Sequence, residues 1–364
     1  MSTIKVNNID PRNTGETVSV NGLAMPNAGT LANRNKIING DMRIAQRGTA
    51  AVTATGAYPV DRFRQLVGNT AGAVTFQQET TDVPAGFDYA TKGTVTTADA
   101  TTDATQRWSI DQKIEGYNVA DLRFGTADAK SVTLSFWVKS SVAGVYCASL
   151  LGASTRGFVN EYTINSANTW EYKTITVPGD TSGTWVVDNG TGLQVFFSLT
   201  GGSSLQGTAG SWQSNQKECT SNQTQLLQTL SATWLVAGVQ LEAGTNATPF
   251  EYRDYGYELA SCQRYFQLLQ FGSGVGLNST TIARQSWPLR VTMRANMTIE
   301  KVGTATWFYG TGNASINVIG SNYSKPNVAQ VDLTVTTTGG ALTNAAPCFI
   351  ESGPNDYFTA SAEL

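Results

Sequence analysis

The stretch from Trp234 to Gln267 reads WLVAGVQLEAGTNATPFEYRDYGYELASCQRYFQ and marks a change of pattern in this chain. On both sides of it, apolar residues recur with the period of two that is typical of β-strands. Inside it and just beyond its end, five apolar residues follow one another in steps of four, three, four and three: Tyr255, Leu259, Cys262, Phe266 and Leu269. This spacing places them on one side of an α-helix, so the sequence predicts a linking helix over residues 251–270.

The apolar stripe of this helix must pack against something. One partner is a sheet of the same chain, and the other is the same helix in neighbouring subunits, because the spacing is also that of a coiled-coil seam. Fewer than three heptads fit in the segment, too few to establish a coiled coil. The sequence therefore leaves open whether the stripe belongs to a core or to a trimer interface.

The residues before the helix read as a series of short strands. The clearest covers residues 132–139, where Val132, Leu134 and Phe136 share one side and Trp137 lies on the other. From that side Trp137 could pack on the other sheet, on the helix or on a neighbouring subunit. Further alternating runs cover residues 36–38, 107–114, 170–177, 184–187, 193–199 and 233–239, whereas 205–229 is polar and poorly patterned. Many short strands without intervening helices predict an antiparallel sandwich of jelly-roll type.

The chain therefore divides into four predicted parts. Residues 1–34 have too few apolar positions to build a core alone, so they form either a disordered arm or a segment that orders on a partner. Residues 35–250 form the jelly-roll sandwich, 251–270 the linking helix and 271–364 a smaller carboxy-terminal β domain. The predicted fold class is mainly β.

Composition excludes several classes of protein. Charged residues make up only 14% of the chain, against about 25% in typical soluble domains, and this suits a large subunit interface. The net charge is −3 without a Lys/Arg cluster, so we expect no nucleic-acid partner. No apolar run approaches 18 residues, so we expect no membrane insertion. The four cysteines are scattered along the chain. We expect them to be small buried apolar side chains in a protein that is made in a reducing cell: Cys147, Cys219, Cys262 and Cys348.

The residues available for catalysis are few. The chain has no histidine, which removes His-dependent triads and His-based metal motifs, and we predict no cofactor and no metal site. Paired carboxylates remain, namely Asp99 with Asp103 and Asp111 with Glu115, but nothing in the sequence fixes either pair at a catalytic separation. The sequence therefore predicts that the chain is not an enzyme.

Aromatic residues near turns are the candidates for glycan binding, because an aromatic face packs on the apolar face of a hexose. Trp212 lies in a Gly/Ser/Gln-rich segment, and Trp307 and Tyr309 lie beside a Gly-Thr-Gly turn. Loops and turns commonly carry recognition residues, so these three are the predicted contacts.

Six blocks of the sequence carry a resemblance to a known group of proteins. They are NKIINGDMRIAQRGT at 35–49, YPVDRFR at 58–64, IDQKIEG at 110–116, VTLSFWVKSS at 132–141, GVQLE at 238–242 and ELASCQRYF at 258–266. In this order they resemble bacteriophage tail-fibre and tail-appendage proteins.

The resemblance implies a structural virion protein assembled in the host cytoplasm. Its jelly roll would be similar to a carbohydrate-binding module, and its amino-terminal arm, residues 1–34, would attach to tail or neck proteins of the phage. The subunits would form a homotrimer that binds host surface polysaccharide without covalent chemistry. Two alternatives stay open: a head or neck decoration fibre with little receptor affinity, and a carboxylate-dependent glycan depolymerase.

Overall fold

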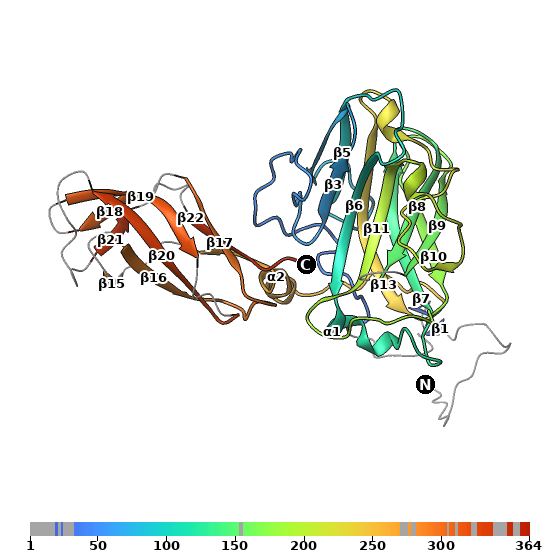
Figure 1. Ribbon diagram of the computed structural model, residues 1–364. Helices are drawn as coiled ribbons and strands as arrows, with labels where there is room; N and C mark the ends of the chain where they lie inside the picture. The colour runs from blue at the N-terminus through green and yellow to red at the C-terminus, as the bar shows by residue number, and fades with distance from the viewer. Residues whose placement is uncertain are drawn as a thin grey trace, which may run out of the picture. The chain divides into compact units, whose positions relative to one another are not determined.

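The computed structural model describes residues 19–20, 23–24, 33–152, 156–269, 276–277, 282–303, 306–309, 312–321, 326–337, 348–351 and 357–364. The chain divides into two compact units, Met1–Arg253 and Asp254–Leu364. In the described parts of both units the named strands pair antiparallel, and helices are few and short (Figure 1). The predicted class, mainly β with an antiparallel sandwich, is confirmed.

The first unit is a sandwich of two sheets. The five-stranded sheet has the order β10-β7-β13-β5-β4, with β4 Ala73–Glu79, β5 Ala90–Thr97, β7 Val132–Ser140, β10 Glu171–Val177 and β13 Thr233–Ala243. The six-stranded sheet has the order β12-β9-β8-β11-β6-β3, with β3 Arg64–Gly68, β6 Arg107–Glu115, β8 Gly144–Leu151, β9 Gly157–Ile164, β11 Thr191–Gly201 and β12 Trp212–Gln213. Short helical turns join them: α1 Gly116–Val119, η1 Ala120–Leu122, η2 Ser203–Leu205 and η3 Leu226–Gln228. Within the amino-terminal arm, β1 Ser19–Val20 pairs with β2 Leu23–Ala24.

The core of the first unit lies between the two sheets. Strand β7 buries Leu134 and Phe136 on its inner face and leaves Trp137 half-buried on its outer face, as the alternation predicts. Phe136 contacts Phe197 of the opposite sheet with ring centroids 5.0 Å apart, and Phe197 lies 5.6 Å from Trp234. Large aromatic rings thus fill the space between the sheets.

Two predicted strands of the first unit are loops. In residues 36–38 the backbone of Ile38 bonds to the side chain of Gln112 in both directions, at 2.8 Å each, instead of joining a sheet. Residues 184–187 are a loop after β10. The polar segment 205–229 contacts the six-stranded sheet, because the Ser149 hydroxyl donates to the Glu218 carbonyl at 2.9 Å.

The described residues of the second unit form one α-helix and two small sheets. Helix α2 covers Tyr255–Gln263. The three-stranded sheet has the order β14-β22-β17, with β14 Phe266–Leu269, β17 Thr298–Val302 and β22 Tyr357–Ser361. The other sheet has the order β15-β16-β20-β19-β18-β21, with β15 Gly276–Leu277, β16 Ile282–Pro288, β18 Thr306–Tyr309, β19 Gly312–Ser321, β20 Val328–Thr337 and β21 Cys348–Glu351.

The predicted helix over residues 251–270 is too long. After α2 ends at Gln263, Phe266 and Leu269 lie in β14, where they pair with Ser361 and Phe358 of β22. The backbone of residues 266–269 therefore pairs with the distant strand β22 instead of continuing the helix that the local spacing predicts. Of the predicted stripe, Cys262, Phe266 and Leu269 are buried and Leu259 is half-buried, whereas Tyr255 is 57% exposed. The trimer role of the stripe remains a prediction.

Cys147, Cys219 and Cys262 are buried, as predicted, and none of them forms a disulfide in the part of the chain that the structure describes. Burial raises the pKa of the Cys147 thiol to about 11, so it is not a reactive thiolate. Cys348 lies in β21, and its side chain is outside the described residues. No helix among the described residues has the length and apolar character needed to cross a membrane.

Candidate functional site

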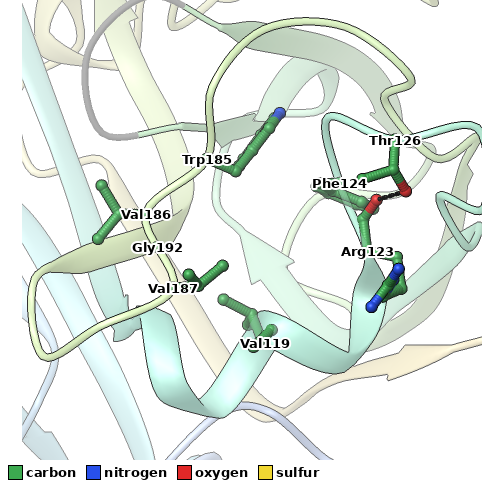
Figure 2. Close-up of a pocket in the computed structure, with 9 residues that line it drawn as sticks. Val119, Arg123, Phe124, Thr126, Trp185, Val186, Val187 and Gly192 are labelled. Atoms are coloured by element: carbon green, nitrogen blue, oxygen red, sulfur yellow. Dashed lines mark hydrogen bonds between the residues drawn. The ribbon is translucent and has the colours of Figure 1, made fainter.

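Two hollows in the first unit are lined by aromatic side chains. The smaller has a volume of about 210 Å³ and lies between the α1–η1 turn and the loop before β11 (Figure 2). Its lining residues are Val119, Ala120, Arg123, Phe124, Thr126, Trp185, Val186, Val187 and Gly192. The larger has a volume of about 600 Å³.

The predicted glycan contact Trp212 lies behind the smaller pocket rather than in it. Its ring packs edge-on against Trp185, Phe124 and Phe158 at centroid distances of 5.5, 5.7 and 5.2 Å. Its indole N–H donates to the Pro178 carbonyl at 2.7 Å. These contacts give Trp212 a supporting position under the Trp185 ring.

The other predicted contacts, Trp307 and Tyr309, lie in strand β18 of the second unit. Tyr309 pairs with Gly312 of β19 and Cys348 of β21. The side chains of both residues are outside the described residues, so their predicted role remains a prediction.

Two of the four carboxylates weighed for catalysis, Asp111 and Asp99, have structural partners. Arg64 donates to both oxygens of Asp111 at 3.0 Å, and Gln194 donates to one of them at 2.6 Å. Burial raises the pKa of Asp111, although the positive charge of Arg64 acts to lower it. Asp99 accepts from the Thr70 hydroxyl at 2.7 Å. Among the described residues, no group of three or more Cys, Asp or Glu side chains is placed to hold a metal ion.

The larger hollow is a groove on the outer face of the five-stranded sheet. It is lined by Phe87, Ser135, Trp137, Tyr172, Gly238, Ala247, Thr248, Pro249, Phe250 and Tyr252. Trp137 of β7 is the cross-strand partner of Tyr172 of β10, and their ring centroids lie 5.3 Å apart. Tyr172 is 44% exposed. Since both strands are fixed by the sheet ladder, the two rings form a rigid aromatic wall.

A bulge in β13 shapes the floor of the groove. Ala237 pairs with Trp137, and the ladder resumes only at Gln240 with Ser135, so Gly238 and Val239 have no partner in β7. Gly238 has a φ of +61°, and a Cβ there would lie 2.5 Å from the Phe87 ring. Only glycine both adopts this backbone conformation without cost and leaves room for the ring.

Phe87 belongs to a second aromatic wall. Its ring lies 5.1 Å from Phe250 and 5.7 Å from Tyr252, which lie 5.0 Å from each other. The Tyr252 hydroxyl donates to the Gly86 carbonyl, which ties this wall to the loop before β5. Partial burial, with Asp41 and Asp88 nearby, raises the pKa of Tyr252, so the hydroxyl keeps its proton.

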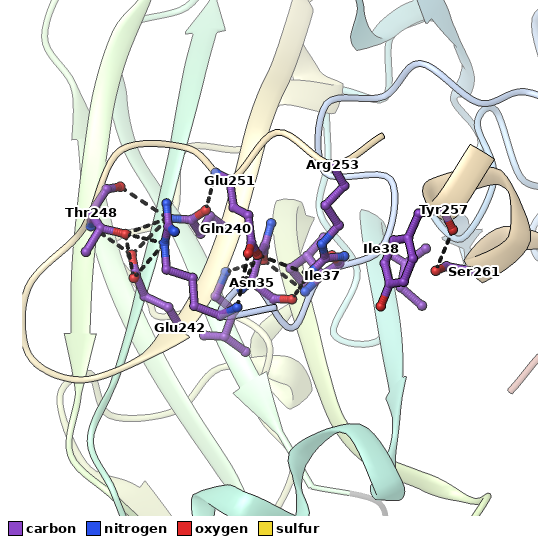
Figure 3. A network of polar contacts seen from close by, with 12 residues as sticks. Asn35, Ile37, Ile38, Gln240, Glu242, Thr248, Glu251, Arg253, Tyr257 and Ser261 are labelled. Atoms are coloured by element: carbon purple, nitrogen blue, oxygen red, sulfur yellow. Dashed lines mark hydrogen bonds and ion pairs between the residues drawn. The ribbon is translucent and has the colours of Figure 1, made fainter. Parts of the chain in front are cut away.

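A buried polar network fixes the segment that carries Phe250 and Tyr252 (Figure 3). The Glu242 carboxylate accepts from the backbone N–H and the hydroxyl of Thr248, at 2.8 and 2.7 Å. Gln240 donates to Glu242 at 2.9 Å and accepts from the Glu251 N–H at 2.8 Å. Arg34 donates to the Thr248 hydroxyl at 2.7 Å. A loop held at both ends in this way presents its aromatic side chains in one arrangement.

The same network contains the block near residue 35. The Asn35 side chain accepts from the Leu241 N–H at 3.0 Å, and its backbone N–H donates to Glu251 at 2.9 Å. Arg253 donates to the Asn35 and Ile37 carbonyls and pairs with Glu251 at 3.3 Å. Blocks separated by some 200 residues in the sequence thus meet beside the groove (Figure 3).

Sequence reasoning missed four of the five groove aromatics and left Trp137 unassigned. The outward position of Trp137 on a strand with an apolar inner face was the available signal. The position of Tyr172 beside Trp137 depends on the pairing of β10 with β7, and no local sequence pattern specifies that pairing. Phe250 stands directly before the predicted helix over residues 251–270, and Tyr252 stands inside it, so neither was expected beside a groove.

Comparison with protein-family models found no match, and no curated protein sequence matches this chain. Among solved structures, the enzymatically active domain of tailspike protein 4 of bacteriophage CBA120 matches with 12% identity and a TM-score of 0.31, over 58% of this chain and 21% of that chain. A family 4 carbohydrate-binding module matches with 15% identity and a TM-score of 0.31, over 56% and 97% of the two chains. The family 11 carbohydrate-binding module of Clostridium thermocellum, in complex with a β-1,3-1,4-mixed-linked tetrasaccharide, matches with 16% identity and a TM-score of 0.29. The match covers 55% of this chain and 99% of that chain.

Proposed function

We propose that the first unit binds a neutral glycan chain non-covalently in the groove between the Trp137–Tyr172 wall and the Phe87–Phe250–Tyr252 wall. The observation that carries this proposal is five aromatic rings around an open groove of about 600 Å³ whose lining has no charged side chain. Sugar rings have apolar C–H faces that pack on aromatic rings, and their hydroxyls bond to polar side chains such as that of Ser135. The volume lies within the range of about 300–1,000 Å³ that holds a drug-sized ligand, which corresponds to a few sugar units.

We propose binding without cleavage. A glycosidase of the usual kind needs two carboxyl groups roughly 5–10 Å apart on either side of the scissile bond. The groove lining contains none, and Asp111 is buried in a pair with Arg64 on the other sheet. Incubation of the protein with host polysaccharide tests this point, and release of oligosaccharides would overturn it.

For the whole chain, we propose a subunit of a homotrimeric phage tail fibre or tail appendage that attaches the virion to host surface polysaccharide. The ordered sequence blocks support this, and residues 1–34 are the proposed attachment arm. Antibody labelling of virions distinguishes a tail position from the head or neck position of the alternative decoration fibre.

The groove is tested by binding of the full chain to a panel of purified host-surface polysaccharides. Trp137→Ala and Tyr172→Ala should each weaken binding by about tenfold or more, equivalent to roughly 1.4 kcal/mol. The matched control is Tyr117→Ala, which removes an aromatic ring that is 62% exposed on α1 outside the groove. Equal binding by all three folded variants would refute the groove as the site.

A further inference from the structure

The smaller pocket has a chemistry unlike that of the groove. It combines an aromatic face, three valine side chains and one cationic residue, Arg123. Figure 2 shows the side chains of Trp185, Val187, Val119 and Arg123 around it. Val187 is 57% exposed, so its apolar side chain is accessible from the pocket.

The aromatic face of the pocket is held in place from behind. Trp185 packs edge-on against Phe124 at 4.8 Å and against Trp212 at 5.5 Å. Its indole N–H donates to the Ser182 carbonyl at 3.2 Å, so its one donor is already used. The ring therefore offers a ligand an apolar surface and no hydrogen bond.

The position of Arg123 is fixed by its backbone. Its φ of +59° ends the η1 turn, and its N–H donates to the Ala120 carbonyl at 3.2 Å. Its carbonyl accepts from the Thr126 hydroxyl at 2.7 Å. A non-glycine residue held in the left-handed region carries a cost, and such residues concentrate at binding sites.

The guanidinium of Arg123 makes no hydrogen bond or ion pair with another side chain in the part of the chain that the structure describes. Two acidic residues on the adjoining segments have other partners. Asp121 pairs with Lys36 at 2.8 Å, and Asp188 accepts from the Gly190 N–H at 2.8 Å. A planar guanidinium beside an apolar wall matches a carboxylate bidentately.

We propose that this pocket is a second binding site, for a single sugar ring that carries a carboxylate. The ring would pack on Trp185 and the valines, and its carboxylate would accept from Arg123. A volume of about 210 Å³ is below the roughly 300–1,000 Å³ of sites for larger ligands, so one ring fits and a chain does not. The site differs from the groove, whose lining is uncharged, and does not depend on the function proposed for the groove.

The test uses the full chain and three small probes, followed by ligand-observed NMR. The probes are the methyl glycosides of glucuronic acid and N-acetylneuraminic acid, and the neutral methyl glucoside as the control. We expect at least one acidic probe to bind, more weakly at high salt, and the neutral probe not to bind. Arg123→Gln should weaken acidic binding by about ten- to hundredfold, and Arg123→Lys should weaken it less.

Variants of the groove separate the two sites. Trp137→Ala and Tyr172→Ala should leave binding of the acidic probes unchanged, whatever they do to polysaccharide binding. Three results would each overturn the second site: no binding of either acidic probe, equal binding of the neutral probe, or equal affinity in the folded Arg123→Gln variant.

Discussion

Replacing Gly238 by alanine tests whether the bulge of β13 holds the groove open. The left-handed conformation at φ +61° costs alanine about 1–2 kcal/mol. In addition, the new Cβ would lie 2.5 Å from the Phe87 ring, which must move by about 1 Å to restore ordinary contact. Overpacking of this kind costs about 1–3 kcal/mol, so the expected loss of stability is roughly 2–5 kcal/mol.

Two variants separate the strain from the clash. Gly210 has a φ of +77°, and a Cβ added there would meet no atom within 4 Å, so Gly210→Ala should cost only the backbone strain of about 1–2 kcal/mol. In a Phe87→Ala background, the loss of stability caused by Gly238→Ala should fall to the same value of about 1–2 kcal/mol, because the ring that the new methyl group would meet is absent. The coupling between positions 87 and 238 should therefore be about 1–3 kcal/mol.

Urea unfolding followed by tryptophan fluorescence measures these differences. The signal comes mainly from the first unit, which holds six of the eight tryptophans. Gly238→Ala should also weaken glycan binding, because a displaced Phe87 disturbs Phe250 and Tyr252. The same loss of stability in the wild-type and Phe87→Ala backgrounds would refute the reasoning.

Three further predictions concern pH, the polar network and assembly. Burial raises the pKa of Glu218 from 4.5 to about 7 against the effect of Arg107, so the folded state binds a proton that the unfolded state releases. The free energy of unfolding should therefore fall as pH rises from about 4.5 to 7, and Glu218→Gln should remove this contribution when urea unfolding is compared at pH 5 and pH 8. Thr248→Val removes the hydroxyl that bonds to Glu242 and Arg34, so it should cost about 1–3 kcal/mol in urea unfolding and should weaken glycan binding. Native mass spectrometry of the full chain should give the mass of three subunits, and a monomer would remove the fibre interpretation.

The sequence predicts the sandwich well because the inner faces of its strands follow a simple period. In β7 the alternation of Leu134 and Phe136 with Trp137 corresponds to the observed inner and outer faces. The period alone specifies neither which strands are neighbours nor which outer faces come together. The pairing of Trp137 with Tyr172 is therefore a property of the sheet order and not of either strand.

Local patterns fail where distant parts of the chain compete for the same backbone. Phe266 and Leu269 continue a helical spacing, but their backbone pairs with Phe358 and Ser361 of β22. Residues 36–38 look like a strand, but their polar groups bond to Gln112 and to the β13 region. In both cases the deciding partner is far away in the sequence, and a local pattern does not contain it.

The two walls of the groove are held by different means, and this difference carries a consequence for binding. Trp137 and Tyr172 stand on paired strands, so the separation of their Cα atoms changes only if the sheet itself distorts. Phe250 and Tyr252 stand on a segment whose position depends on side-chain bonds to Glu242 and Asn35. A change in that network should move one wall and leave the other in place. Variants such as Thr248→Val should therefore weaken binding of a glycan that spans both walls more than binding of a single sugar ring stacked on Trp137. A short sugar that loses as much affinity as a long chain would contradict this two-wall description.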